Sequence, residues 1–127
     1  MTFLEELWAS VEKPDLSFLR RMQAAVPSSL LNPAVLSPSG EVIPCDMTTL
    51  LIWQMKFPDA IRVVRTLVRK IEVSTVFLPI AVADQHFETL LLSGPRSGGW
   101  RYSTLKEARR GHRKIVRGIR DGKLEDL

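Results

Sequence analysis

Cysteine, histidine and tyrosine are scarce in this chain, which has 127 residues and contains one, two and one of them, respectively. The lone cysteine, Cys45, excludes an internal disulfide and is typical of a protein in a reducing compartment. One cysteine and two histidines cannot supply the ligands of a structural zinc site. The Asp-rich loop of a calcium site is also missing, although a site made of carboxylates alone stays open. We therefore expect no metal and no cofactor.

Long apolar runs are missing as well. The longest, residues 76–83, has eight residues and contains Pro79, whereas a membrane-spanning helix needs about 20. The first six residues lack the basic start of a signal peptide and include Glu5 and Glu6. We therefore expect no membrane association, and we expect the protein to be located in the cytoplasm.

Charge of one sign is concentrated near the C-terminus. The net charge is +4, and the hydrophobic share of 45% is that of an ordinary globular protein. Residues 96–127 contain ten Lys/Arg and four Asp/Glu, a net of +6, whereas residues 1–95 contain eight and ten, a net of −2. The chain has the length of one domain. We therefore predict a single domain, residues 1–127, whose basic character belongs to its last quarter.

The first 30 residues predict a helical hairpin that extends the domain. Thr2 and Glu5 form a capping box at the start of the first helix, and Pro14 ends this helix. A second helix follows in residues 15–26. The apolar face of the hairpin either completes the core or docks against a partner. The residues that would dock are Leu4, Trp8, Phe18 and Leu19.

The next segment predicts a short β-hairpin followed by a helix. Residues 34–36 and 41–43 flank the sequence Ser-Pro-Ser-Gly, which is typical of a tight turn between two strands. Asp46 or Thr48 can cap a helix that continues to Phe57, where the following proline stops it.

The middle of the chain predicts a small antiparallel meander. Residues 71–76 alternate between apolar and polar side chains, and residues 86–92 are a further candidate strand. Arg69 and Lys70 are a candidate turn. Residues 61–68 fit a strand by composition and a helix by periodicity, so that their type stays open.

The last part of the chain combines a Gly-rich loop, residues 93–100, with a basic amphipathic helix. A second capping box at Thr104 and Glu107 starts this helix, which runs from Leu105 to about Arg120. Its apolar stripe is expected to pack on the sheet and consists of Leu105, Ala108, His112, Ile115 and Ile119. The fold class is therefore α+β, with an extension (1–30), a core (34–120) and a tail (121–127) that we expect to fray.

Three motifs in this core carry a family resemblance. They are Val-Ser-Thr-Val-Phe-Leu at 73–78, Phe-Glu-Thr-Leu at 87–90, and Tyr-Ser-Thr-Leu-Lys-Glu-Ala followed by Gly-His within 102–112. Their order and spacing resemble a family of small, functionally uncharacterised proteins of tailed phages and prophages, with VSTVFLG-like, FETMVFGG-like and YSTWEEAxxGH-like motifs. The resemblance covers about residues 35–117 and departs at Leu105, where tryptophan is usual. It implies a phage-related origin, an α+β core and a bacterial host, and it supplies no activity.

The basic helix is the strongest functional feature of the sequence. Six cations within twelve residues can line up on phosphates, or they can form a solvated face. Gly111 and Gly118 each weaken the helix by about 1 kcal/mol relative to Ala, which favours a role in close packing. No helix-turn-helix or zinc-finger signature accompanies the cations. They are Arg109, Arg110, Arg113, Lys114, Arg117 and Arg120.

Other candidate sites are weaker. Arg96 and Arg101 flank the Gly-rich loop before a helix N-terminus, where an anion or nucleotide can bind, but the Lys-Ser/Thr end of a P-loop is missing. His112 lies on the apolar stripe and is expected to be buried and hydrogen-bonded, with no serine or cysteine assigned as its nucleophile. His86 lies beside Asp84 and Glu88, which indicates either a metal site or an ordinary loop edge. We expect no catalytic residue and no enzyme.

These observations lead to one main hypothesis and two alternatives. The main hypothesis is a non-enzymatic, phage-encoded accessory protein that binds a host protein complex, for example as an inhibitor of a defence system. A DNA-mimicking inhibitor would be acidic, which this chain is not. The alternatives are a nucleic-acid-binding module that uses the basic helix, and a small-anion or nucleotide binder at residues 93–101. A homodimer is also compatible with the sequence.

Overall fold

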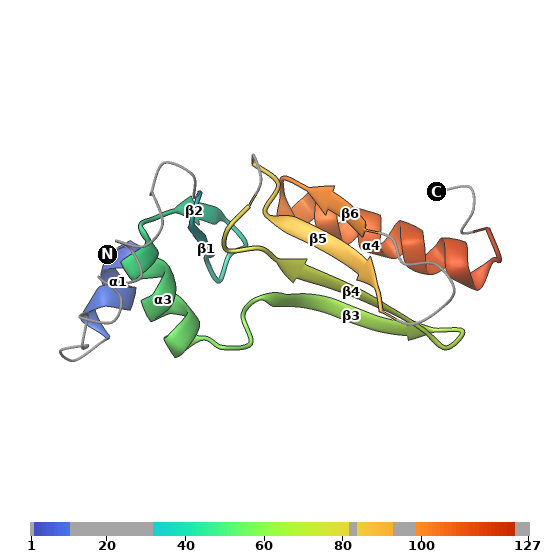
Figure 1. Cartoon of the computed structure of the whole chain (residues 1–127), viewed down its shortest axis with the longest axis horizontal. Coiled ribbons are helices and arrows are strands. Elements are labelled where there is room, and N and C mark those ends of the chain that lie inside the picture. The colour runs from blue at the N-terminus through green and yellow to red at the C-terminus, as the bar shows by residue number, and fades with distance from the viewer. Residues whose placement is uncertain (1, 11–31, 82–83, 93–98, 124–127) are drawn as a thin grey trace.

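The computed structural model describes residues 2–10, 32–81, 84–92 and 99–123 of the chain. Within them, three helices and two antiparallel sheets confirm the predicted α+β class (Figure 1). The second predicted helix of the N-terminal extension, with Phe18 and Leu19, lies outside the described residues, as does most of the predicted tail. In chain order the elements are α1 (Phe3–Ala9), β1 (Ala34–Leu36), β2 (Val42–Pro44), α3 (Met47–Lys56), β3 (Arg62–Val68), β4 (Ile71–Phe77), β5 (Phe87–Leu91), β6 (Gly99–Tyr102) and α4 (Leu105–Arg120).

One end of the molecule is formed by α1, α3 and the β1–β2 hairpin (Figure 1). The two predicted caps are confirmed, because the Thr2 side chain accepts a hydrogen bond from the Glu5 amide and the Asp46 side chain accepts one from the Thr49 amide. Leu7 of α1 is buried in the same cluster as residues of α3 and β1. The described part of the extension therefore completes the core at this end.

The other end is a four-stranded meander in the order β3-β4-β5-β6. Residues 62–68 are a strand, which settles the open choice for this segment. Arg69 and Lys70 form the predicted turn, and both have positive φ, at 47° and 66°. Positive φ at both central residues is the geometry of a type I′ turn, whose twist matches that of the flanking strands. The tight β3–β4 hairpin follows from this turn.

The predicted end of the Gly-rich loop is wrong. Gly99 and Trp100 belong to β6, which pairs with β5 from Leu90↔Gly99 to Phe87↔Tyr102. The strand is only four residues long and begins at a glycine, so that propensity and alternation give little signal for it. It forms because Trp100 and Tyr102, two residues apart, extend from the same face of the strand and pack against buried residues.

Helix α4 packs along one face of this sheet (Figure 1). The Thr104 side chain caps it, as predicted, by accepting a hydrogen bond from the Glu107 amide. The predicted stripe is buried at four of its positions, namely Ala108, His112, Ile115 and Ile119, and the burial of Val116 and Gly118 widens it. On the sheet, Val73, Thr75 and Phe77 of β4 are the buried residues of the alternating pattern. The predicted packing of a basic amphipathic helix on the sheet is therefore confirmed.

Aromatic rings connect the two ends of the molecule. Trp53 of α3 meets Phe77 of β4 edge to face, with ring centroids 5.6 Å apart. Phe77 in turn contacts Phe87 of β5, at 5.5 Å. Such pairs add about 0.5–1.5 kcal/mol each beyond the area that they bury. The helical end and the sheet end are thus held together by buried packing.

Gly111 brings α4 close to β6. A Cβ atom at this position would overlap the phenol of Tyr102, from its hydroxyl oxygen to its ring. A glycine in the middle of a helix destabilises it by about 1 kcal/mol relative to alanine. The close approach explains why a glycine occurs here, and it fixes the Tyr102 ring against the helix.

We predict that Gly111→Ala lowers the free energy of unfolding by about 1–2 kcal/mol, because overpacking outweighs the gain in helix propensity. Urea unfolding monitored by circular dichroism measures this change. In a Tyr102→Ala background the same substitution becomes neutral or stabilising, because the ring that it overlaps is gone. An equal loss of stability in both backgrounds would show that the Tyr102 contact is not the cause.

Candidate nucleic-acid interface on α4 and β6

The outer face of α4 is a continuous basic surface. All six cations that the sequence indicated are exposed, and Lys106 joins them as a seventh. The 3.6-residue repeat of a helix places Arg109, Arg113 and Arg117 along one row and Arg110 and Lys114 along the next. Because the opposite face of α4 is buried against the sheet, the cations face the solvent. We call these seven side chains the basic face of α4.

The basic face lacks partner charges within the described part of the chain. The salt bridges Arg65–Glu72 and Arg101–Glu88 do not involve α4. Glu107 is the one acidic residue of α4 itself. Like charges three or four residues apart destabilise a helix by a few tenths of a kcal/mol per pair. The surface therefore carries a concentrated positive potential, which an anionic ligand would neutralise.

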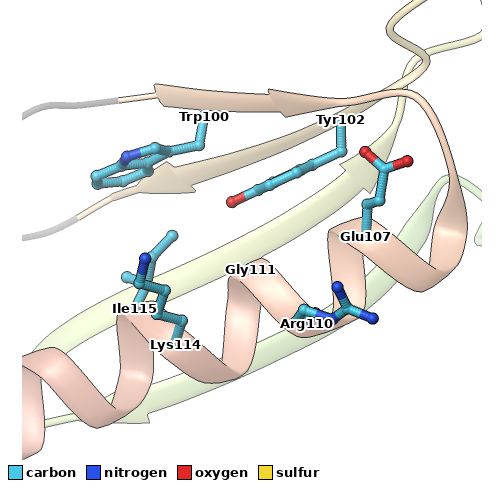
Figure 2. Close-up of a pocket in the computed structure, with 7 residues that line it drawn as sticks. All are labelled: Trp100, Tyr102, Glu107, Arg110, Gly111, Lys114 and Ile115. Atoms are coloured by element: carbon cyan, nitrogen blue, oxygen red, sulfur yellow. The ribbon is translucent and has the colours of Figure 1, made fainter.

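A groove of about 370 Å³ lies between β6 and α4 (Figure 2). The rings of Trp100 and Tyr102 extend from the strand toward the helix, and Gly111 contributes no side chain on the opposite side. Glu107, Arg110 and Lys114 belong to the rim, and Ile115 lies below Trp100. Aromatic faces beside guanidinium and ammonium groups are the chemistry that binds nucleobases and phosphates together.

A second hollow, of about 500 Å³, lies where α4 begins, next to the β1–β2 turn. Gly40 in this turn has a φ of 90° and lies against the side chain of Leu105, so that the turn packs closely on the helix. The hydroxyl and charged residues that line the hollow are Ser39, Thr104, Lys106, Arg109 and Arg113. Cations of the basic face thus border hollows on both sides of α4.

The Gly-rich-loop hypothesis gains no support from Arg101. Its Nε donates a hydrogen bond to Glu88 Oε2 at 2.8 Å, across the β5–β6 pair. Because Trp100 and Tyr102 point toward α4, Arg101 between them points to the opposite face of the sheet. Arg96 lies outside the described residues. Anion binding at residues 93–101 therefore stays a prediction.

The proposed docking residues of α1 contact the rest of the protein. Leu4 is half-buried against the core cluster that contains Leu7. The Trp8 Nε1 donates a hydrogen bond to Thr49 Oγ1 of α3 at 3.2 Å, and its ring is partly exposed. Core completion explains the position of both side chains, so that docking through α1 stays a prediction.

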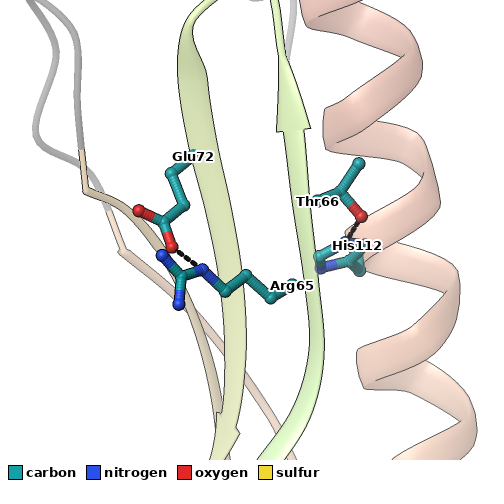
Figure 3. Close-up of polar contacts among 4 residues, drawn as sticks. All are labelled: Arg65, Thr66, Glu72 and His112. Atoms are coloured by element: carbon teal, nitrogen blue, oxygen red, sulfur yellow. Dashed lines mark hydrogen bonds and ion pairs between the residues drawn. The ribbon is translucent and has the colours of Figure 1, made fainter.

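His112 has the hydroxyl partners expected of a buried histidine. It is 3% exposed, and its Nε2 lies 2.8 Å from Thr66 Oγ1 (Figure 3). Its Nδ1 lies 2.7 Å from Thr75 Oγ1, which lies 2.6 Å from Thr89 Oγ1. Burial lowers the pKa of His112, because the charged imidazolium loses its water. The ring is therefore a structural link between α4 and three strands.

The remaining reactive groups are also engaged or suppressed. His86 Nδ1 donates to the Leu78 carbonyl oxygen at 2.9 Å, and its ring stacks on Phe77. Among the described residues, no three His, Cys, Asp or Glu side chains lie close enough to hold a metal ion. Burial, and to a lesser degree the charge of Asp46, raises the pKa of Cys45 to about 11. The thiol is therefore protonated at neutral pH and is a poor nucleophile.

Trp100 is the residue of this site that the sequence reading missed. The glycine-rich composition predicts a loop that ends at Trp100, whereas the structure places this residue in β6 facing α4. The signal available was the alternation Trp-x-Tyr directly before the capping box at Thr104, which is typical of a strand that faces a helix. The structure thus adds an aromatic wall to two of the predicted cations, Arg110 and Lys114.

No protein-family model, no curated protein and no solved structure matches this chain. The resemblance to the tailed-phage family therefore stays a prediction. No helix within the described ranges is long and apolar enough to cross a membrane.

The lowered pKa of His112 predicts a loss of stability in mild acid. The unfolded chain takes up a proton near the ordinary pKa of 6.5, whereas the folded protein does so only at lower pH. The contribution of neutral His112 to the free energy of unfolding is thus fully present well above pH 6.5. It falls as the pH drops below this value, by at most about 1.4 kcal/mol per pH unit.

Urea unfolding at pH 7.5 and pH 5.5, for the native chain and His112→Gln, tests this linkage. We expect a smaller difference in stability between the two pH values in the variant than in the native chain, because the variant lacks the buried imidazole. The same pH dependence in both proteins would contradict the assignment.

Proposed function

We propose that the protein binds nucleic acid, without catalysing a reaction, through the basic face of α4. The observation that carries this proposal is the concentration of seven exposed cations on one helix, with no salt bridge to any described residue. An ordinary solvated face would more often mix charges of both signs. On α4 the basic residues outnumber the acidic ones by seven to one.

The chemistry of arginine fits this role. Five of the seven cations are arginines, whose planar guanidinium groups can donate two parallel hydrogen bonds to a phosphate. Neutralising phosphates releases condensed counterions, which drives association at low salt. Phosphate contacts position a protein but read no sequence. We therefore propose binding with little sequence specificity.

Replacing Arg113 and Arg117 by glutamine is expected to weaken binding of a labelled oligonucleotide about 30-fold at 100 mM salt. This estimate takes about 1 kcal/mol for each phosphate contact that is lost. Fluorescence anisotropy measures the dissociation constant. The matched control is Lys56→Gln with Arg62→Gln, which removes the same charge from exposed positions outside α4. Equal weakening by both pairs would indicate an effect of net charge and would contradict a site on α4.

The main hypothesis from the sequence, a phage-encoded accessory protein that binds a host protein complex, is a second candidate. The observation that favours it is the exposed apolar surface on the face of the sheet opposite α4. Leu67 and Leu92 there are 74% and 56% exposed, and a hollow of about 420 Å³ lies between β3, β4 and Leu92. Exposed apolar side chains beside a hollow are a common feature of protein-binding surfaces.

For this second candidate, Leu67→Glu is expected to abolish capture of a host protein from nuclease-treated bacterial lysate without loss of stability. Affinity capture followed by mass spectrometry gives the result. Met55→Glu is the matched control, because Met55 is also 74% exposed but lies on α3. Capture that survives Leu67→Glu, or that Met55→Glu reduces equally, would count against docking on this face.

A further inference from the structure

We infer that the groove between β6 and α4 holds an unpaired nucleobase against Trp100, so that the nucleic acid bound by this protein is single-stranded. The inference rests on the proposed function, because it names the class of nucleic acid that the basic face of α4 binds. It adds a contact that charge alone does not supply, and it predicts that the ligand must expose the flat faces of its bases.

The aromatic wall of the groove is preformed. Trp100 and Tyr102 alternate on β6 and project toward α4 side by side (Figure 2). Tyr102 is held in place, because Gly111 lets its ring lie against the helix. Trp100 packs against the cluster that contains Ile115, and the residue is only half-buried. An aromatic ring that is already immobilised loses little entropy when a base stacks on it.

The charges at the rim determine how a bound nucleotide is oriented in the groove. Lys114 borders the groove at the Trp100 end, whereas the Glu107 carboxylate and Arg110 lie toward the Tyr102 end (Figure 2). A phosphate is repelled by Glu107 and attracted by Arg110 and Lys114. The sugar–phosphate backbone therefore passes over the Lys114 end and continues onto the basic face, while the base enters beside Trp100.

A duplex cannot use this groove. Its bases are stacked on one another and paired, so that their flat faces are covered, and it can reach only the cations. Single strands offer unstacked bases, and stacking on an aromatic side chain tolerates every base. The expected ligand is a single strand of DNA or RNA that is bound with little sequence preference.

Anisotropy titrations with four ligands test the inference. The ligands are 12-nucleotide oligo-dT, 12-nucleotide oligo-U, a 12-base-pair DNA duplex, and inorganic polyphosphate as an unlabelled competitor that has charge but no bases. Trp100→Leu is expected to weaken binding of the better of the two single strands by roughly 5- to 150-fold, the range measured for loss of one stacked base. Binding of duplex and polyphosphate is expected to change by less than about twofold. Trp100→Phe keeps a ring and is expected to retain most of the affinity.

A spectroscopic signature separates stacking from a structural role. In a Trp8→Phe variant the remaining tryptophans are Trp100 and Trp53, and Trp53 is only 1% exposed. Oligo-dT or oligo-U is expected to quench the fluorescence of this variant, whereas polyphosphate is not.

Two outcomes would overturn the inference while leaving the proposed function intact. One is binding that Trp100→Leu leaves unchanged but that the Arg113 and Arg117 substitutions weaken. The other is a loss of affinity in Trp100→Leu that is equal for single strands, duplex and polyphosphate, since this would show that Trp100 only supports the fold. If no ligand binds in a way that depends on α4, the proposed function itself fails.

Discussion

The packing of α4 on the sheet is the constraint on which the rest of the structure depends. The helix buries Ala108, His112, Ile115 and Ile119 against the strands, and this fixes its rotation about its own axis. Every cation of the helix is then on the outside. The same contact brings Gly111 against Tyr102 and so determines the width of the groove beside β6. The basic face and the aromatic wall are thus two results of one packing arrangement.

Polar groups in the middle of this contact set the position of the helix along the sheet. An apolar interface alone tolerates a shift of one element along the other, whereas buried hydrogen bonds have partners at one position only. His112 meets hydroxyl groups of both β3 and β4, at 2.8 and 2.7 Å. A displaced helix would leave the two ring nitrogens of His112 buried without these partners, at a cost of about 1–3 kcal/mol for each group. The polar link therefore helps to hold Lys114 opposite Trp100, and Arg110 toward the Tyr102 end of the groove (Figure 2).

Local signals in the sequence predicted much of this arrangement. The structure confirms the features that depend on residues close together in the sequence. These are the caps at Asp46 and Thr104, the turn at Arg69-Lys70 and the apolar stripe of α4. The sequence did not predict β6, the fourth strand of the meander. This strand is too short for its pattern to be recognised, and its formation depends on contacts with β5 and α4. The cations of the candidate site could be found from helical spacing. Trp100 could not be added to them, because the groove exists only once the strand and the helix lie side by side.

The central claim is that the basic face of α4 binds nucleic acid by neutralising phosphates. A titration of the native chain with a single-stranded oligonucleotide, repeated between 50 and 300 mM salt, tests it most directly. The account predicts that the logarithm of the binding constant falls linearly with the logarithm of the salt concentration. If all seven cations of α4 made phosphate contacts, the slope would approach about −5, and fewer contacts would give a proportionally smaller value. Binding that is independent of salt, or no binding at the lowest salt concentration, would contradict the account.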